Sequence, residues 1–428
     1  MKKLDVLFEA WGQSWVLGTL AENDRLVLFE YSAEALTRGI DLSPRHLKLR
    51  AEAYGGFPSH LSHLPGLVSD ALPDGWGLLL MNRLFSQAGR NPDTVSPLDR
   101  LAFVGRRAMG ALSFRPSEEL DGEGTNWSLL QLAQAAHQVA DEDVVALRML
   151  ALAGGSPHGA RPKALVMYDF QTRIVSTLDG AVGEPWLVKF QGQTEHPEVC
   201  AVENVYAQMA RECGIRMGPT EHFPLGPKLA AFGTRRFDRE RGMRVPVHSM
   251  AGALHVDFRT PALDYETVLR ATGFFTQDQS QVFNAFRLCV FNVIFNNRDD
   301  HAKNFSLRMN EQMRWELAPG YDLTYNPGPG GYHQTSVMGE ALTPARNHLM
   351  SLASKLAFRA ADATDVIDQT CSAAEGLRTA LEQASVRRVT RQTLEKAVEV
   401  NLLRCGIAHQ GRKAAGRITG KSRAGRPK

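Results

Sequence analysis

The spacing of apolar and polar residues predicts a chain that begins with strands and continues into helices. Short apolar runs, separated by glycine and Asn-Asp turns, predict strands at residues 4–8, 15–18 and 25–31. Helical spacing follows at 78–85, where Asp74 stands at the N-cap position, and again after Ser128, a second candidate N-cap. A polar break at 116–126 separates these two helices. We expect a domain boundary there.

The middle and the end of the chain carry two further patterns. Residues 164–168 and 186–190 are apolar enough for buried strands, with a helix expected over 201–213 and another strand around 235–238. Beyond about residue 262 the pattern is helical: Val282, Phe286 and Val290 belong to a wide apolar stripe, and helices continue over 347–404. The patterns predict an α+β fold with a mainly β N-terminal part and a mostly helical C-terminal part.

Composition places the chain among ordinary soluble globular proteins. It has 428 residues, 43% hydrophobic and 22% charged, enough for two or three domains. The apolar run at 288–295 is too short to span a bilayer, and Asp5 and Glu9 interrupt the stretch that a signal peptide keeps apolar. Five scattered cysteines form no C-x-x-C pair, which favours a reducing compartment. We therefore expect a cytoplasmic protein without membrane contact.

The positive charge of the chain is concentrated at its C-terminal end. Residues 411–428 contain seven Lys or Arg and no acidic residue, which leaves 42 basic and 46 acidic residues elsewhere. With almost no apolar residues, this segment is predicted to be disordered. Its last five residues resemble an AT-hook, so we consider contact with DNA phosphates or the minor groove beside a purely solvated tail.

The first candidate for chemistry directly follows the predicted buried helix. Residues 296–302 are polar or small, and loops on a rigid scaffold often carry functional residues. Asp299 precedes Asn304 by five residues, the separation of the base Asp and the metal-binding Asn in the kinase loop H-R-D-x-x-x-x-N. The local order differs, because His301 follows the Asp. The spacing favours phosphoryl transfer, with an ordinary loop as the alternative.

Phosphoryl transfer needs further charges, and the sequence offers candidates for them. Asp322 follows a short strand-like segment and is a candidate second carboxylate for Mg²⁺. Lys189 stands in an apolar strand, which is costly unless its ammonium group is paired or faces a cleft; Glu203 is a candidate partner. Glycines in the loop 154–163 would let backbone N–H groups approach phosphates, although that loop matches neither G-x-G-x-x-G nor a Walker A motif.

Together these segments resemble the HipA family of toxin kinases from bacterial type II toxin–antitoxin systems. The resemblance spans most of residues 1–375 and rests on LPGLVSDALPDGWG, GARPKALV, WLVKF, ENVYAQMARECGI, RRFDR, RDDHAKNFSL and APGYDL, in that order. It implies a protein-kinase-like, two-lobed body behind a small N-terminal domain. The expected parts are a coupling domain (1–125), an N-lobe-like region with phosphate loop and hinge (126–260), a helical catalytic lobe (261–408) and the basic tail (409–428), which lies outside the resemblance.

The resemblance also implies an activity and partners. Such proteins phosphorylate a protein Ser or Thr with ATP and Mg²⁺, often on an aminoacyl-tRNA synthetase, and so arrest translation. It implies a small DNA-binding antitoxin of HipB type, whose complex with the kinase represses the shared operon by binding operator DNA. The resemblance says nothing about the basic tail, for which a contact with operator DNA and a purely solvated segment both stay open.

The resemblance assigns roles to individual residues. Asp299 would be the general base, Asn304 and Asp322 would hold Mg²⁺, and Lys189 would contact phosphates with Glu203 as its ion-pair partner. The residues expected around ATP are His158, Gly159, Ala160, Arg161, Pro162 and Lys163 of the phosphate loop, Arg235, Arg236 and Phe237 of an adenine-reading hinge that works through backbone groups, and His301, Ala302, Lys303, Asn304, Tyr321 and Asp322.

Two further residues carry expectations of regulation and of a supporting role. Ser156 aligns with a serine that family members autophosphorylate; a phosphate there would expel the loop and block ATP binding. Asp300 stands where a smaller residue is common, and it would aid the metal or face water.

Three other functions stay open at this point. A small-molecule kinase would use the same Asp/Asn/Asp arrangement, although the N-terminal domain speaks for the toxin family. A catalytically weak co-repressor would act on DNA through the antitoxin, but a pure scaffold has no need for Lys189, Asp299, Asn304 and Asp322 together. A metal nuclease built on Asp299, Asp300 and His301 would need no ATP.

Overall fold

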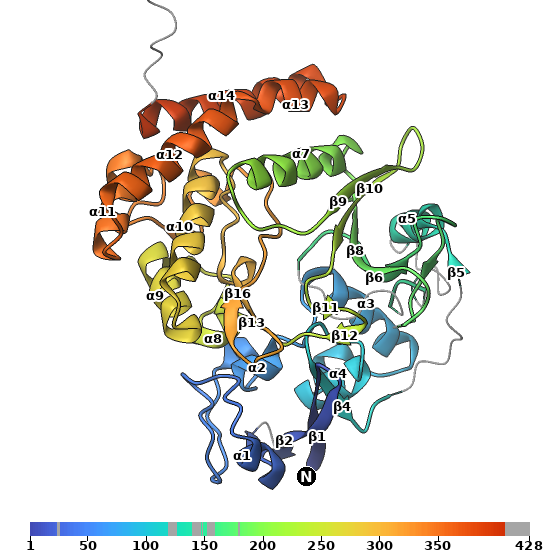
Figure 1. The fold of residues 1–428 in the computed structure, drawn as a ribbon. Coiled ribbons are helices and arrows are strands. Elements are labelled where there is room, and N and C mark those ends of the chain that lie inside the picture. Colours follow the sequence, from blue (N-terminus) through green and yellow to red (C-terminus); the bar gives the residue numbers. More distant parts are fainter. Residues whose placement is uncertain are drawn as a thin grey trace, which may run out of the picture.

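The computed structural model describes residues 1–23, 26–118, 126–138, 147, 149–151, 159–178 and 180–406. The predicted α+β fold class is confirmed: sheets occupy the first half of the chain and helices most of the second. Figure 1 shows the N-terminal sheet at the bottom, a larger sheet on the right, and the helical region at the upper left. Within the described part, no helix combines the length and apolar character needed to cross a membrane.

The N-terminal part is built on a four-stranded antiparallel sheet in the order β3-β2-β1-β4. The three predicted strands are present: the first two are longer than expected, and the third covers Leu26–Tyr31 of the predicted 25–31. Side chains of β3 alternate between exposed and buried positions, as a half-buried strand requires. The elements of this part are β1 (Lys2–Ala10), β2 (Gln13–Asn23), β3 (Leu26–Tyr31), α1 (Ala33–Arg38), η1 (Ser59–Leu61), α2 (Gly66–Ser69), α3 (Gly75–Gln87), η2 (Pro92–Thr94), α4 (Pro97–Val104) and β4 (Leu112–Arg115).

A six-stranded antiparallel sheet in the order β5-β7-β6-β8-β10-β9 follows. The hydroxyl of Ser128 accepts a hydrogen bond from the N–H of Gln131 at 3.2 Å, so the predicted N-cap is confirmed. Helix α7 packs against β9 and β10. The elements are β5 (Asn126–Trp127), α5 (Leu129–Gln138), β6 (Lys163–Tyr168), β7 (Val175–Ser176), β8 (Glu184–Phe190), α7 (Glu198–Glu212), β9 (Thr220–Pro224) and β10 (Ala230–Arg235).

The strand predicted around 235–238 is wrong in its extent, because β10 ends at Arg235. The next residues leave the sheet so that Arg236 can turn its guanidinium onto the buried carboxylate of Asp238, with N···O distances of 2.8 and 2.7 Å. Arg239 pairs with the same carboxylate at 2.9 Å. A buried charge is tolerated only when paired, and this tertiary pairing overrides the local strand preference.

The C-terminal part is mainly helical, with small sheets at its base. The apolar stripe predicted along 282–294 is buried in α10, which packs against α9, α12 and α14. The elements are β11 (Arg239–Glu240), β12 (Met243–Arg244), β13 (Val247–Ser249), α8 (Met250–Leu254), β14 (Leu263–Asp264), α9 (Tyr265–Thr276), α10 (Gln279–Ile294), η4 (Ala302–Asn304), β15 (Ser306–Met309), β16 (Trp315–Leu317), η5 (Pro329–Gly331), β17 (Thr335–Ser336), α11 (Arg346–Lys355), α12 (Ala360–Glu375), α13 (Leu377–Gln383) and α14 (Arg388–Cys405).

Polar contacts bind the N-terminal part firmly to the rest of the molecule. Arg244 of β12 donates hydrogen bonds to the carbonyl groups of Arg106, Ala108, Gly110 and Leu112 at 2.9–3.0 Å. Asp70, which ends α2, accepts from His248 Nδ1 at 2.7 Å and from the N–H and hydroxyl of Ser249 at 2.8 and 2.6 Å. One hydrophobic core also runs from Leu4 in β1 to Cys405 in α14. The N-terminal part is therefore an integral wall of the molecule.

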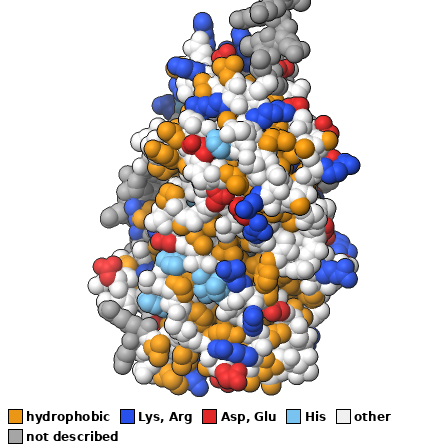
Figure 2. All heavy atoms as spheres, turned by 90° about the vertical axis from the view of Figure 1, so that its left-hand side faces the viewer, with side chains coloured by type: hydrophobic (Ala, Val, Ile, Leu, Met, Phe, Trp, Pro, Cys, Tyr) orange, Lys and Arg blue, Asp and Glu red, His pale blue; other side chains and the backbone are white. Residues whose placement is uncertain are grey.

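Histidines gather where α2 and α8 meet, on the face that Figure 2 shows. The rings of His46 and His255 are stacked with centroids 4.0 Å apart, and His60 lies close enough to hydrogen-bond the carbonyl of His255 at 3.0 Å. Burial, together with His46, His248 and His60, lowers the pKa of His255 to about 4, against a smaller opposing effect of Asp70.

Acid is expected to weaken this contact. Because the folded protein disfavours the charged form of His255, its contribution to stability is complete above pH 6.5 and is lost as the pH falls toward 4. Discounted for partial exposure, the loss in unfolding free energy is about 1–2 kcal/mol. Urea unfolding at pH 7.5 and pH 4.5 measures it. In His255→Gln the free energy of unfolding should differ less between pH 7.5 and pH 4.5 than in wild type. Replacing the exposed His196 by Gln should leave that difference unchanged. An equal difference in both variants would refute the assignment to His255.

Candidate functional site

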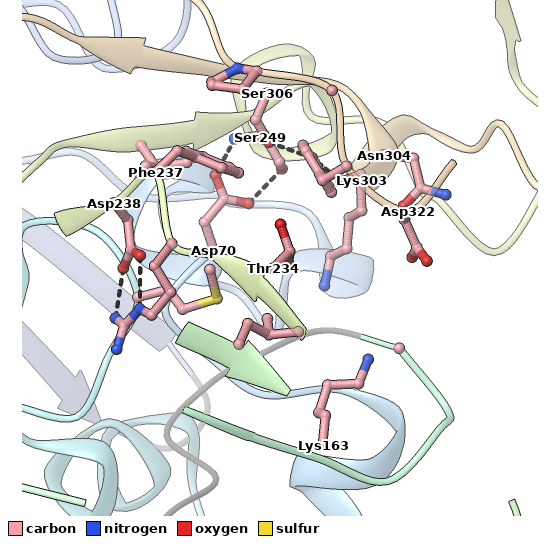
Figure 3. A pocket seen from close by; sticks show the side chains of 18 of the residues that line it. Asp70, Lys163, Thr234, Phe237, Asp238, Ser249, Lys303, Asn304, Ser306 and Asp322 are labelled. Atoms are coloured by element: carbon pink, nitrogen blue, oxygen red, sulfur yellow. Dashed lines mark hydrogen bonds and ion pairs between the residues drawn. The ribbon is translucent and has the colours of Figure 1, made fainter. Parts of the chain in front are cut away.

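A large cavity lies where the N-terminal part, the six-stranded sheet and the helical region meet. It encloses about 1330 Å³ of space, including the part open to solvent. In Figure 3, Lys163 and Lys303 extend into it from opposite sides, and Phe237 lies at the other end from Asp322. Among the residues assigned to ATP from the sequence, those that line it are Gly159, Lys163, Lys189, Arg235, Arg236, Phe237, His301, Lys303, Asn304, Tyr321 and Asp322.

Lys189 is the central cation of the cavity. It points from β8 to two carboxylates, Glu203 of α7 and Asp322, each with an N···O distance of 2.6 Å. Burial by itself would lower the pKa of Lys189, but Asp322 and Glu203 raise it above its ordinary value. The reciprocal effect outweighs burial at Asp322, whose pKa Lys189 and Lys163 hold well below the usual range. The site is therefore charged at neutral pH.

A second lysine stands beside the first. Lys163 of β6 is paired in the sheet register with Lys189 of β8 and is almost completely buried. Burial and the neighbouring charge of Lys189 lower the pKa of Lys163 to about 8, against smaller effects of Asp322 and Asp74. Two adjacent ammonium groups at the mouth of a glycine-bearing loop favour a ligand with several negative charges.

The loop after α10 places Asp299 and Asn304 close together. The side-chain N–H of Asn304 donates to the backbone carbonyl of Asp299 at 2.6 Å, and the N–H of Lys303 donates to Nδ1 of His301 at 3.2 Å. These bonds fix the loop and leave the amide oxygen of Asn304 as an acceptor. The Asp299 side chain is half-buried and lies outside the cavity lining. Burial raises its pKa, reinforced by Asp322 and Asp300 and opposed by His301 and Lys189.

The segment 235–237, which was expected to be the adenine-reading hinge, differs in detail from that prediction. The ring of Phe237 lies 5.4 Å from that of Tyr321, whose hydroxyl is anchored by Ser306 and by the carbonyl of Lys303. The backbone N–H groups of Arg235 and Arg236 already donate to Pro219 and Pro185 at 3.0 and 2.9 Å. These two donors are therefore occupied, and adenine recognition at this segment would use its other backbone groups and the ring of Phe237.

Two residues have roles other than those expected from the sequence. Arg161 pairs with Glu195 at 3.0 Å and with Glu203 at 3.2 Å, so its charge supports the partner of Lys189 rather than lining the cavity. Asp300 neither faces water nor points to a metal site: it is fully buried and accepts hydrogen bonds from Tyr265, His333 and two backbone N–H groups. Because the carboxylate of Asp300 stabilises the conformation of the loop, it gives no support to the alternative of a metal nuclease.

The other expected residues are placed as follows. Ala302 is buried beneath the loop, and Ala160 and Pro162 lie next to the cavity-lining Gly159 and Lys163 without lining the cavity themselves. Ser156 and His158 lie outside the described residues, as does the basic tail from 409 to 428.

Sequence reasoning missed the contribution of the N-terminal part to this cavity. Seven of the lining residues come from it: Leu67, Asp70, Ala71, Asp74, Met109, Ala111 and Leu112. Asp74 was expected to cap α3, but its side chain makes no cap hydrogen bond. Its carboxylate instead accepts from the N–H of Gly159 at 2.6 Å and pairs with Lys303 at 2.6 Å. The signal present in the sequence was the Pro-Asp-Gly turn, which local capping rules explained in another way.

The donor set fits a magnesium ion that binds together with phosphates. Asn304 and Asp322 both line the cavity (Figure 3) and offer one amide and one carboxylate ligand. In the described ranges, no three His, Cys, Asp or Glu side chains converge in a way that could hold a metal by themselves. Mg²⁺ is usually held by one or two carboxylates, with waters and substrate phosphates supplying the rest. When bound there, it would neutralise charge on the phosphates.

Comparisons with known proteins agree with this arrangement. Residues 155–377 match the family model "HipA-like C-terminal domain", and residues 8–115 match "HipA N-terminal domain". The fold is similar to a solved Shewanella oneidensis MR-1 toxin–antitoxin complex of HipA, HipB and operator DNA, with 15% identity, a TM-score of 0.69, and coverage of 94% of this chain and 96% of that one. Among the curated proteins, none matches the sequence.

A second solved structure shares less of the fold. It is the Helicobacter pylori proinflammatory kinase CtkA, with 11% identity, a TM-score of 0.41, and coverage of 57% of this chain and 89% of that chain. A likeness at that level carries no argument about the reaction.

Proposed function

The chain belongs to the HipA family, and from this premise we propose that it is a kinase that transfers the γ-phosphate of ATP to a serine or threonine hydroxyl of a protein, as the toxin of a toxin–antitoxin pair. The observation that carries the proposal is Lys189, which contacts both Glu203 and Asp322 at 2.6 Å inside the cavity. In protein kinases a lysine paired with a helix glutamate holds the phosphates beside a metal-binding aspartate.

The shape and charge of the cavity support a nucleotide as ligand. Its apolar lining, which includes Leu187 and Val247, suits a purine ring, and Phe237 offers an aromatic surface. Lys163 and Lys189 lie where a triphosphate needs cations, and the glycine at 159 lets the backbone approach. Asn304 and Asp322 would hold Mg²⁺, which would neutralise negative charge on the phosphates.

Asp299 is proposed as the general base. Its carboxylate takes the proton of the substrate hydroxyl as the hydroxyl oxygen attacks the γ-phosphorus, and the bond from that phosphorus to the oxygen of ADP breaks. Burial raises the pKa of Asp299, which brings it nearer to the pH at which a base works best. Asn304, anchored to the backbone of Asp299, keeps base and metal ligand in register.

The partners are proposed from the family. The solved HipA relative is bound to HipB and operator DNA, which supports a HipB-like antitoxin and operator DNA as partners of this chain. A translation component such as an aminoacyl-tRNA synthetase is proposed as the protein substrate. Autophosphorylation at Ser156 and a DNA contact of the basic tail stay predictions, since both segments lie outside the described residues.

The test is phosphorylation by the purified full-length chain, without antitoxin, in a bacterial lysate with radiolabelled ATP and Mg²⁺. We expect label on phosphoserine or phosphothreonine of a protein, identified by mass spectrometry. Lys189→Met removes the ammonium group and keeps the chain length, so it should lower labelling by at least about a hundredfold. Thermal unfolding checks that this variant is folded.

Each of the other possible results would indicate a different function of this chain or a different site. Label in low-molecular-mass compounds alone would indicate a small-molecule kinase. Absence of ATP binding and of labelling, together with operator binding in the presence of the antitoxin, would indicate a co-repressor. Labelling that is unchanged in Lys189→Met would separate the activity from this cavity.

A further inference from the structure

We propose that Asp74 is a positioning residue of the nucleotide site, and that through it the N-terminal part holds the phosphate loop and the catalytic loop in their working arrangement. The inference rests on the proposed kinase function and adds to it a residue from outside the catalytic body. Asp74 lies at the start of α3, far along the chain from both loops that it contacts.

One carboxylate joins the two loops. Its Oδ1 accepts a hydrogen bond from the backbone N–H of Gly159, within the phosphate loop, at 2.6 Å. Its Oδ2 accepts the ammonium group of Lys303, in the loop that begins with Asp299 and ends with Asn304, at 2.6 Å. The side chains of both Asp74 and Lys303 are largely shielded from water, with relative exposures of 12% and 11%. A shielded, charge-assisted pair is stronger than a surface ion pair.

The turn that follows Asp74 also holds Gly159, from its other polar group. The N–H of Trp76 donates to the carbonyl of Gly159 at 3.0 Å, so both backbone groups of that glycine are bonded to the turn 74–76. Gly75 has φ of +44°, and a Cβ there would come within 2.5 Å of the Gly159 carbonyl oxygen. The chain can approach this closely because position 75 has no side chain.

The pair stands between two hollows. Asp74 and Lys303, with Asp70 and Phe258, line both the main cavity and a second one of about 710 Å³ that also contains Arg100. The ammonium group of Lys303 lies 4.2 Å from the centre of the Phe258 ring, which limits its movement further. Lys303 is thus held at a fixed point of the wall, next to Asn304.

Loss of this pair should loosen the groups that meet the phosphates. Misplacing a binding or catalytic group by about 1 Å can cost a hundredfold in rate. Asp74→Asn keeps the size of the side chain and an oxygen for the Gly159 N–H, but it removes the charge that holds Lys303. We therefore expect kcat/KM for ATP to fall about ten- to hundredfold, with most of the loss in KM.

The experiment is a double-mutant cycle on the full-length chain: wild type, Asp74→Asn, Lys303→Met and the double variant, with KM and kcat for ATP and thermal unfolding for each. If Asp74 acts through Lys303, adding Asp74→Asn to Lys303→Met should change kcat/KM less than twofold. Asp93→Asn, which removes an exposed carboxylate from the same part of the chain, is the matched control and should match wild type.

Every outcome decides the proposal. An unchanged KM in Asp74→Asn, or additive losses in the double variant, would overturn it. If Asp74→Asn does not fold, Asp74→Glu is used in its place, and hydrogen exchange at the amide of Gly159 is compared with wild type. Faster exchange together with a raised KM supports the proposal. Protection equal to wild type, despite the displaced carboxylate, counts against it. If the wild type neither binds Mg–ATP nor labels protein, the proposed kinase function fails instead. Hydrogen exchange at Gly159 still measures the contact between Asp74 and Gly159 in that case, so the two failures can be told apart.

Discussion

Asp299→Asn is expected to lower the rate of phosphoryl transfer by about 10²–10⁴-fold while Mg–ATP binding is retained. The amide keeps the size of the side chain but can no longer take the proton of the attacking hydroxyl. Because Asp299 lies outside the cavity lining, its replacement should leave the nucleotide contacts of Lys189 and Asp322 in place. Single-turnover labelling and the affinity for a fluorescent ATP analogue separate the two effects.

The pH dependence provides a second readout of the same prediction. The base works when it is unprotonated, and burial raises the pKa of Asp299. The wild-type rate should therefore decline on acidification at a higher pH than an ordinary aspartate, near 3.9, would give. The residual rate of Asp299→Asn should lack that decline. Asp365→Asn, on an exposed face of α12, is the control and should keep the full rate. A rate of phosphoryl transfer in Asp299→Asn equal to that of wild type would show that Asp299 is not the general base.

Asp300→Ala is expected to lower the free energy of unfolding by about 3–5 kcal/mol, as loss of one partner from a buried charged network does. The carboxylate accepts from the hydroxyl of Tyr265 at 2.8 Å, from His333 Nδ1 at 2.9 Å, and from the N–H groups of Gln334 and Thr335 at 2.8 and 3.2 Å. Alanine would leave these donors buried without an acceptor, which is the physical reason for the loss.

Urea unfolding measures this loss, and the preceding residue is its natural control. Asp299→Asn should change the free energy of unfolding by less than about 1 kcal/mol, because its side chain is half-buried and has no comparable set of donors. Two adjacent aspartates would then differ in kind, one needed for the reaction and the other for the fold. A small loss in Asp300→Ala would show that the network is dispensable.

Local patterns predicted the elements that depend on local physics. Strands β1 and β2 follow from short apolar runs bounded by turn residues, and helix α10 follows from the helical spacing of its apolar residues. The cap at Ser128 follows from its position before an apolar run. The spacing of Asp299 and Asn304 likewise identified one loop that the structure holds together. Such features need only neighbouring residues, so the sequence contains them directly.

The remaining features depend on partners that are far apart in the chain. Asp74 occupies a cap position, yet its carboxylate bonds Gly159 and Lys303, 85 and 229 positions away. Similarly, Asp300 looks like a loop residue until the segment around His333 folds over it. Neither spacing nor propensity reports which distant donor will come closest, because that depends on how the sheets and helices pack.

The hydrogen bonds of Arg244 bear on how much of the chain a working enzyme requires. A shortened protein beginning after residue 118 would retain Lys189, Asp299, Asn304 and Asp322. It would also strip Arg244 of four carbonyl partners and Asp238 of the N–H of Gly110, beside a cavity that had lost one side. We therefore expect that activity requires both the N-terminal part and the rest of the chain. The two parts are expected to be inherited together and to change together in evolution.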